Sequence, residues 1–152
     1  MSDELMQVYQ KTVLEHSRNP HHFGPLKGAT RTAVGFNPLC GDKVTIYLST
    51  SADGAQITEA RHETSGCAIC MSSASMMSDA VQKLATDAAV SLCSQLETML
   101  SGNPVESGPG MPLESLAGVR AYPTRVKCAT LPWRTLMAAL SGASSATTEH
   151  SN

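Results

Sequence analysis

Between residues 30 and 64 the apolar and polar positions alternate with a period of two, which predicts β-strands. Three stretches rich in Val, Ile, Thr and Tyr carry this pattern, namely residues 30–36, 43–49 and 57–63. The middle stretch is the clearest, because apolar and polar side chains alternate along its length. The connections between the stretches are short and contain Asn-Pro and Asp-Gly turn signals, so we expect an antiparallel meander.

Outside this region apolar residues recur at spacings of three and four, which predicts helices. Helices are expected over about residues 2–19, 67–84, 87–101 and 113–120, and in a last element around Trp133. Pro132 is expected in the first turn of that last helix, because a proline deeper inside a helix would kink it. Cys128 then lies either just before the helix or in a first turn that ends in a kink.

These elements together predict a single α+β domain over residues 1–140. We expect an N-terminal helix, a three-stranded antiparallel sheet and helices packed on one face of the sheet. A length of 152 residues suits one domain with a core of its own. From Ser141 the chain is rich in Ser, Thr and Ala without periodicity, so residues 141–152 are expected to form a disordered tail.

The overall charge and the cysteine content narrow the class of function. A formal net charge of -2 gives no electrostatic case for binding nucleic acid or an anionic membrane. No apolar run approaches the ~18 residues of a membrane span, and the acidic start Ser2-Asp3-Glu4 is unlike a signal peptide. We therefore expect a cytoplasmic protein, in which five cysteines favour a metal site or reactive thiols over disulfides.

Three cysteines and one aspartate lie where predicted elements begin. Cys40 and Asp42 flank Gly41 at the entry to the second strand, and in extended chain they would face the same way. Gly41 also permits a turn there, in which Asp and Gly are common. Cys67 stands at a helix start, where the helix dipole favours a thiolate, and Cys128 lies near the start of the last helix. Three thiolates and a carboxylate suit tetrahedral zinc, or iron in an iron–sulfur cluster. We expect this metal site at one end of the sheet.

The remaining two cysteines and a histidine pair are not assigned to this ligand set. Cys93 fits the apolar stripe of its helix and is expected in the core. Cys70 lies one helical turn from Cys67 on the same face, so it is a core residue, a spare ligand or a resolving thiol. The adjacent His21 and His22 fall in a loop, where exposed histidines are more often plain surface than ligands.

Four sequence motifs occur in order along nearly the whole chain, up to about Leu140. They are YQKTVLEHSRNPHHFG from residue 9, CGD from 40, GCAIC from 66 with SSASMM shortly after it, and RVKCATL from 125 with a following Trp. In these motifs the chain resembles iron–sulfur cluster assembly proteins of the SufU/IscU/NifU N-terminal family. Lys127 stands where IscU-like proteins carry histidine, and residues 87–122 resemble an extra segment typical of SufU, so the resemblance favours the SufU branch.

The resemblance implies a ligand set and a reaction. Cys40, Asp42, Cys67 and Cys128 match the metal ligands of the family, and in SufU-like proteins the metal is zinc. Cys40 would be the catalytic residue, which accepts sulfur from the persulfide of a SufS-type cysteine desulfurase during iron–sulfur cluster assembly. Other Suf assembly proteins are further candidate partners.

Two other functions stay open at this point. The same ligands could hold a transient [2Fe-2S] cluster, which would make the chain a non-enzymatic scaffold. Alternatively the chain could be a structural zinc module that binds a protein partner. A thioredoxin-like role for Cys67 and Cys70 is disfavoured, because no βαβ context surrounds the pair.

Overall fold

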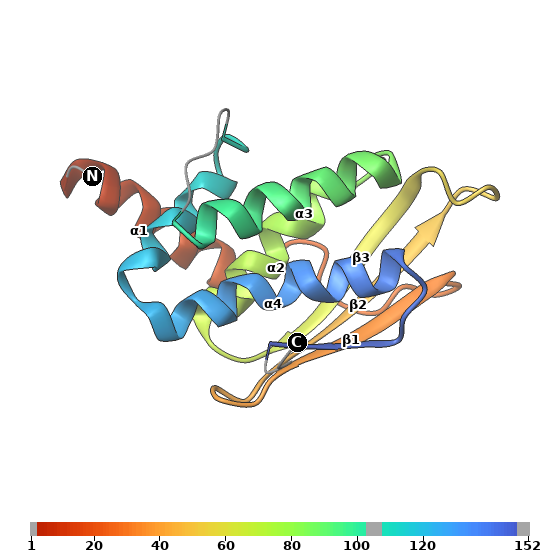
Figure 1. Ribbon diagram of the computed structural model, residues 1–152, viewed down its shortest axis with the longest axis horizontal. Coiled ribbons are helices and arrows are strands. Elements are labelled where there is room, and N and C mark those ends of the chain that lie inside the picture. Colours follow the sequence, from red (N-terminus) through yellow and green to blue (C-terminus); the bar gives the residue numbers. More distant parts are fainter. Residues whose placement is uncertain (1–2, 103–107, 149–152) are drawn as a thin grey trace.

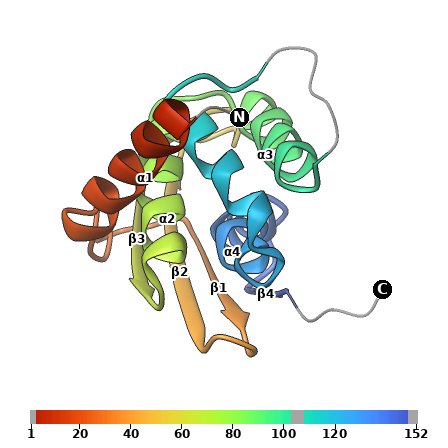
Figure 2. The same cartoon turned by 90° about the vertical axis from the view of Figure 1, so that its left-hand side faces the viewer.

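The computed structural model describes residues 3–102 and 108–148 (Figure 1). Its elements are α1 (Asp3–Arg18), β1 (Arg31–Asn37), β2 (Asp42–Thr50), β3 (Ile57–Ser65), α2 (Ala68–Val81), α3 (Thr86–Leu100), the 3-10 helix η1 (Leu113–Ala121), α4 (Pro123–Leu140) and β4 (Ser145–Thr147). Helices α2 and α4 cover one face of the sheet, α1 lies beside α2, and α3 packs on α4 (Figures 1 and 2). The predicted α+β architecture is confirmed. Among the described helices, none is both long and apolar enough to cross a membrane.

The three long strands form the predicted antiparallel meander, in which β2 pairs with both β1 and β3. The register sets Asn37 at the end of β1 opposite Asp42 at the start of β2. It also sets Lys43 opposite Ser65, the last residue of β3. The β1–β2 turn and the connection from β3 to α2 therefore lie at the same end of the sheet.

The sheet has a fourth strand that the sequence analysis missed. Strand β4 pairs in parallel with β1, so the sheet order is β3-β2-β1-β4 and the sheet is mixed. The pairing is made by the backbone, with Val34 N–H donating to Ser144 O at 2.9 Å and Thr148 N–H donating to Phe36 O at 3.1 Å. Backbone bonds of this kind need no alternation of side chains, so the Ser/Thr/Ala composition gave no signal. Residues 149–152 of the expected tail lie outside the described residues.

The last helix, α4, begins at Pro123, which is earlier than the position of Pro132 predicted. Pro123 occupies its first turn, where a missing N–H costs nothing because that group has no helical partner. Pro132 therefore lies in the middle of α4, contrary to the expectation of a first-turn position, and Cys128 lies in the second turn. Pro132 and Trp133 are both buried, so the packing of this segment outweighs the unfavourable propensity of proline.

The inward positions of the strands change from apolar to polar at one end of the sheet. On β2 the buried positions are Asp42, Val44, Ile46 and Leu48, and on β1 they are Ala33, Gly35 and Asn37. Helix α4 approaches β1 closely at Gly35, where an added Cβ would lie 1.9 Å from Thr135 Oγ1. The core therefore ends in a buried polar pair, Asn37 and Asp42, next to α4.

Candidate metal centre

Three of the four expected ligands meet at this end of the sheet, where the β1–β2 turn and the β3–α2 connection come together (Figure 2). Cys40, Asp42 and Cys128 each offer one ligand atom, and these atoms all lie within 4.8 Å of one another. The fourth expected residue, Cys67, is not in that group of three but adjoins it: its backbone N–H donates to Asp42 Oδ1 at 3.0 Å, and its thiol helps to raise the pKa of Cys128.

The carboxylate of Asp42 is held from two sides. It is 2% exposed. Its Oδ1 accepts a hydrogen bond from the backbone N–H of Cys67 at 3.0 Å, and its Oδ2 accepts one from Asn37 Nδ2 at 3.1 Å. A side chain at position 66 would displace it, because a Cβ on Gly66 would lie 2.2 Å from Asp42 Oδ1. Both carboxylate oxygens are thus fixed while each keeps a lone pair for a further partner.

Cys40 is the most accessible of the four residues. It is exposed, whereas Asp42 and Cys128 are buried and Cys67 is half-buried. The carbonyl of Asn37 accepts hydrogen bonds from the backbone N–H groups of Cys40 and Gly41. Gly41 has a φ of 72°, in the left-handed region that favours glycine. Cys40 and Asp42 therefore converge through a tight turn at Gly41, which is one of the two arrangements that the sequence left open.

The two remaining thiols come from helices. Cys67 is the N-cap residue of α2, as expected from its place before the helix. Cys128 projects from the second turn of α4 and is buried. Burial, together with the neighbouring Asp42 carboxylate and Cys67 thiol, raises the pKa of Cys128 above its ordinary value. The nearby thiol of Cys128 raises the pKa of the exposed guanidinium of Arg125.

Asn37 is a residue of this site that the sequence analysis interpreted only as part of a turn. It is fully buried, and its Nδ2 donates both to Asp42 and, at 3.5 Å, to Cys128 Sγ. Its Oδ1 accepts a hydrogen bond from the buried hydroxyl of Thr148 at 3.1 Å. One signal was available in the sequence: position 37 continues the inward alternation of Ala33 and Gly35, so a polar side chain there must find buried partners.

The other two cysteines lie in the hydrophobic core. Burial, reinforced by the charge of Asp42, raises the pKa of Cys70 well above its ordinary value, so its thiol is protonated at neutral pH. Burial also raises the pKa of Cys93 to about 12. Its thiol contacts the carbonyl of Trp133 at 3.7 Å. The expected core position of Cys93 is confirmed.

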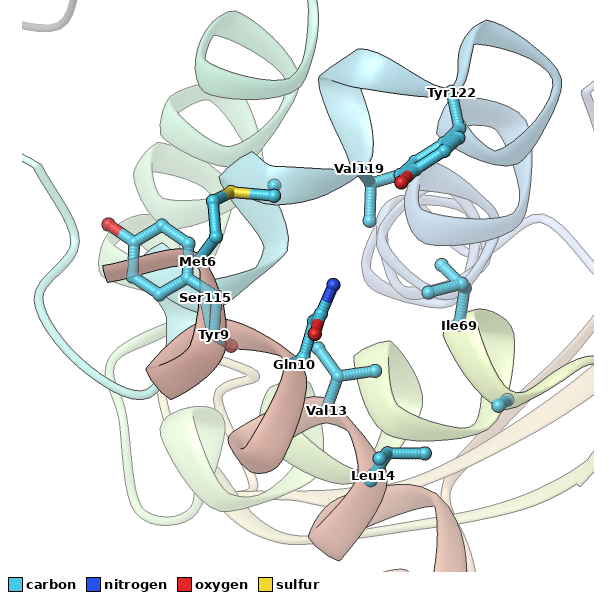
Figure 3. A pocket seen from close by; sticks show the side chains of 11 residues that line it. Met6, Tyr9, Gln10, Val13, Leu14, Ile69, Ser115, Val119 and Tyr122 are labelled. Atoms are coloured by element: carbon cyan, nitrogen blue, oxygen red, sulfur yellow. The ribbon is translucent and has the colours of Figure 1, made fainter. Parts of the chain in front are cut away.

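An apolar pocket of about 320 Å³ adjoins the start of α2 (Figure 3). Its lining comes from α1, α2 and η1 and includes Tyr9, Val13, Ile69 and Val119. None of the lining residues is a cysteine, histidine or acid, so the pocket offers no metal ligand and the candidate centre lies outside it.

Comparison with known proteins assigns the family. Residues 8–141 match the NifU-like N-terminal domain family. The chain belongs to this family. The zinc-dependent sulfurtransferase SufU of Bacillus subtilis is 34% identical over 87% of this chain and 88% of its own length. The iron-sulfur cluster assembly scaffold protein IscU of Streptococcus pyogenes is 37% identical over 90% of this chain and 85% of its own.

A solved structure from the same family supports the fold. The crystal structure of an iron-sulfur cluster assembly scaffold protein for the SUF system, from Fervidobacterium islandicum AW-1, has a TM-score of 0.81 and 29% identity. The alignment covers 91% of this chain and 99% of that one. The resemblance of this NifU-like domain to SufU and IscU proteins, inferred from its motifs, is therefore confirmed.

Proposed function

We propose that this NifU-like domain is a zinc-dependent sulfur acceptor in iron–sulfur cluster assembly. Its ligands would be Cys40, Asp42, Cys67 and Cys128, and its partner a SufS-type cysteine desulfurase. The B. subtilis relative bears the name of such a sulfurtransferase. Cytoplasmic location fits five free thiols among the residues of the chain.

The donor atoms of the site fit zinc. Three thiols and one buried carboxylate supply the four sulfur and oxygen ligands that this borderline-soft ion accepts. Bound zinc would hold the thiols as thiolates and add no redox chemistry of its own. The exposed Arg125 beside Cys128 would offset part of the negative charge of the ligands.

The observation that carries the proposal is the unequal accessibility of the ligands. Asp42 and Cys128 are buried and tied to Asn37, whereas Cys40 lies on an exposed turn. A partner can reach Cys40 while the buried residues stay in place. An arginine, a histidine or a similar group of the desulfurase would displace Cys40 and leave it free to react.

The sulfur transfer that follows needs no oxidant. The Cys40 thiolate attacks the outer sulfur of the desulfurase persulfide and forms a new S–S bond. The S–S bond of the desulfurase breaks, and its cysteine leaves as a thiolate that takes up a proton. Cys40 thereby carries a persulfide, and no net oxidation or reduction occurs.

The test is a Cys40→Ser variant, assayed with a cognate desulfurase. We expect the variant to retain zinc and to lose both the stimulation of alanine release and the transfer of labelled sulfur. Cys93→Ser is the matched control, because that thiol lies in the core away from the candidate ligands and should leave transfer unchanged. Unchanged transfer by Cys40→Ser would refute the assignment.

A scaffold function is the second candidate, because the S. pyogenes relative is named a scaffold. The same four residues would then hold a transient [2Fe-2S] cluster. Anaerobic incubation with desulfurase, iron and cysteine separates the two functions: a sulfur acceptor keeps its zinc, whereas a scaffold gains iron and sulfide with visible absorption. A purely structural zinc module would stimulate no desulfurase and leave Cys40 unreactive.

A further inference from the structure

A second cluster of metal-binding side chains lies at the other end of α2. It joins His16 in the last turn of α1, His21 and His22 in the loop that follows, and Asp79 near the end of α2. Asp79 is 12 residues after Cys67 along α2, which corresponds to about 18 Å at the rise of an α-helix. The cluster is therefore separate from the candidate metal centre.

The side chains of this cluster converge on the carboxylate of Asp79. One oxygen of Asp79 pairs with His21 Nδ1, and the other lies 2.9 Å from His22 Nε2. The rings of His16 and His21 are 4.6 Å apart between centroids. Ligand atoms of His16, His21 and Asp79 all lie within 4.8 Å of one another. The loop position of the two histidines indicates plain surface, but the structure shows both side chains at the carboxylate of Asp79.

The backbone around His21 is fixed from two elements. Its N–H donates to Ser75 Oγ at 2.8 Å, and its carbonyl accepts from Ser78 Oγ at 3.2 Å. The same carbonyl lies 3.0 Å from Nε2 of the buried His62, which belongs to β3. The loop that carries the histidines is thus anchored to both α2 and the sheet.

His22 adopts an unfavourable backbone conformation in that anchored loop. Its φ is 53°, in the left-handed region that non-glycine residues rarely adopt. Its carbonyl accepts the backbone N–H of His62 at 3.1 Å. Strain of this kind persists where the surrounding structure holds it. In this conformation His22 Nε2 lies 2.9 Å from Asp79 Oδ1.

One ring nitrogen of His16 is engaged by a hydrogen bond, and the other is left to bind an ion. The residue is 9% exposed, and Nδ1 lies 2.7 Å from Ser75 Oγ. Histidines that bind metals usually have the second ring nitrogen fixed by such a partner. Because Ser75 engages Nδ1, Nε2 is the nitrogen left for an ion.

We propose that His16, His21 and Asp79 form a second metal site, which takes a divalent transition-metal ion such as Zn²⁺, with His22 as an additional ligand. Imidazole nitrogens with one carboxylate suit these ions and not Mg²⁺ or Ca²⁺, which take oxygen ligands. Ligand atoms on tetrahedral zinc lie about 3.4 Å apart, so modest rotations of exposed side chains would close the present spacing. The ion would cross-link α1, the loop and α2.

The test is the zinc stoichiometry of the full-length protein after loading and desalting, measured by elemental analysis. We expect two zinc ions per chain in the wild type. Asp79→Asn and His21→Ala should each reduce this to one, and Asp87→Asn, an exposed acid on α3, is the matched control that should keep two. Circular dichroism verifies that each variant is folded.

A Cys128→Ser variant separates this site from the proposed sulfur acceptor. It should lose the zinc of the cysteine centre and keep one ion whose X-ray absorption spectrum shows nitrogen and oxygen neighbours without sulfur. Adding zinc should also raise the midpoint of thermal unfolding of Cys128→Ser. The rise should be smaller when His21→Ala is added to this variant. One zinc ion per wild-type chain, or a second ion unaffected by His21→Ala and Asp79→Asn, would show that the cluster is a hydrogen-bonded network only.

Discussion

Replacing Gly66 by alanine should disturb the metal centre by displacing the side chain of Asp42. The new methyl group would lie 2.2 Å from Asp42 Oδ1, 2.9 Å from its Cγ and 3.0 Å from its Cβ. Real Cβ atoms do not approach other atoms so closely, so the carboxylate must move. Asp42 is buried and held by Asn37 and by the N–H of Cys67, so this movement breaks hydrogen bonds that fix the site.

The magnitude follows from overpacking and from the lost hydrogen bonds. Inserting a methyl group into a packed interior costs about 1–3 kcal/mol. A hydrogen bond to a charged acceptor contributes about 1.5–3 kcal/mol. With partial relaxation we expect Gly66→Ala to lower the free energy of unfolding of the metal-free protein by about 2–4 kcal/mol. Zinc affinity should fall by about 10- to 100-fold, as for the loss of a residue that orients a ligand.

A double-mutant cycle with Asp42→Ala isolates the cause. Urea unfolding in the presence of a chelator and a reductant gives the stability of all four proteins, and competition with a chromophoric chelator gives their zinc affinity. In the Asp42→Ala background most of the collision is absent, so Gly66→Ala should cost less than about 1 kcal/mol. If Gly66→Ala is equally costly in both backgrounds, the collision with the carboxylate is not its cause.

Three further predictions concern buried polar groups. Asn37→Ala removes the donor shared by Asp42 and Cys128, and should weaken zinc binding about 10- to 100-fold in chelator competition. Cys70→Ala should keep full zinc occupancy by elemental analysis, because that protonated thiol lies in the core. Burial lowers the pKa of His62 to about 4 from 6.5. The unfolded chain therefore takes up the proton first, and about 3 kcal/mol of stability present above pH 6.5 is lost as the pH falls to 4. His62→Gln should flatten this part of the pH–stability curve in urea unfolding.

The sheet and most helices could be predicted from the sequence because their signals are local. Alternating side chains defined the three long strands, and apolar stripes defined α1, α2 and α3. Strand β4 could not be predicted, because its pairing with β1 uses backbone groups and its side chains carry no period. The start of α4 was misplaced because propensity places Pro132 in a first turn, whereas packing keeps it in the middle of the helix.

The ligand residues of the candidate centre could be predicted from the sequence, but the residues that hold them in place could not. Cysteine and aspartate at element ends indicated the ligands, because three thiolates and a carboxylate together match the donor set of a metal site. Asn37 was missed because its contacts with Cys128 and Thr148 join segments far apart in the sequence. The histidine cluster was missed for the same reason, since Asp79 follows His21 by 58 residues. Pairings at this range depend on the fold and leave no local pattern.

The geometry of α4 over β1 explains how Cys128 reaches Asn37. Leu131 and Thr135 lie over Gly35, while Cys128 contacts Asn37 two residues farther along the strand. Two residues of strand span about 6.6 Å. The middle of the contact is at residue 133, five residues after Cys128. Five residues of helix span about 7.5 Å. The two distances agree, so the close packing at Gly35 fixes the register that delivers the buried thiol to the polar end of the sheet. Continuing α4 through Pro132 is therefore a requirement of the site, because a helix that began at Pro132 would leave Cys128 without this register.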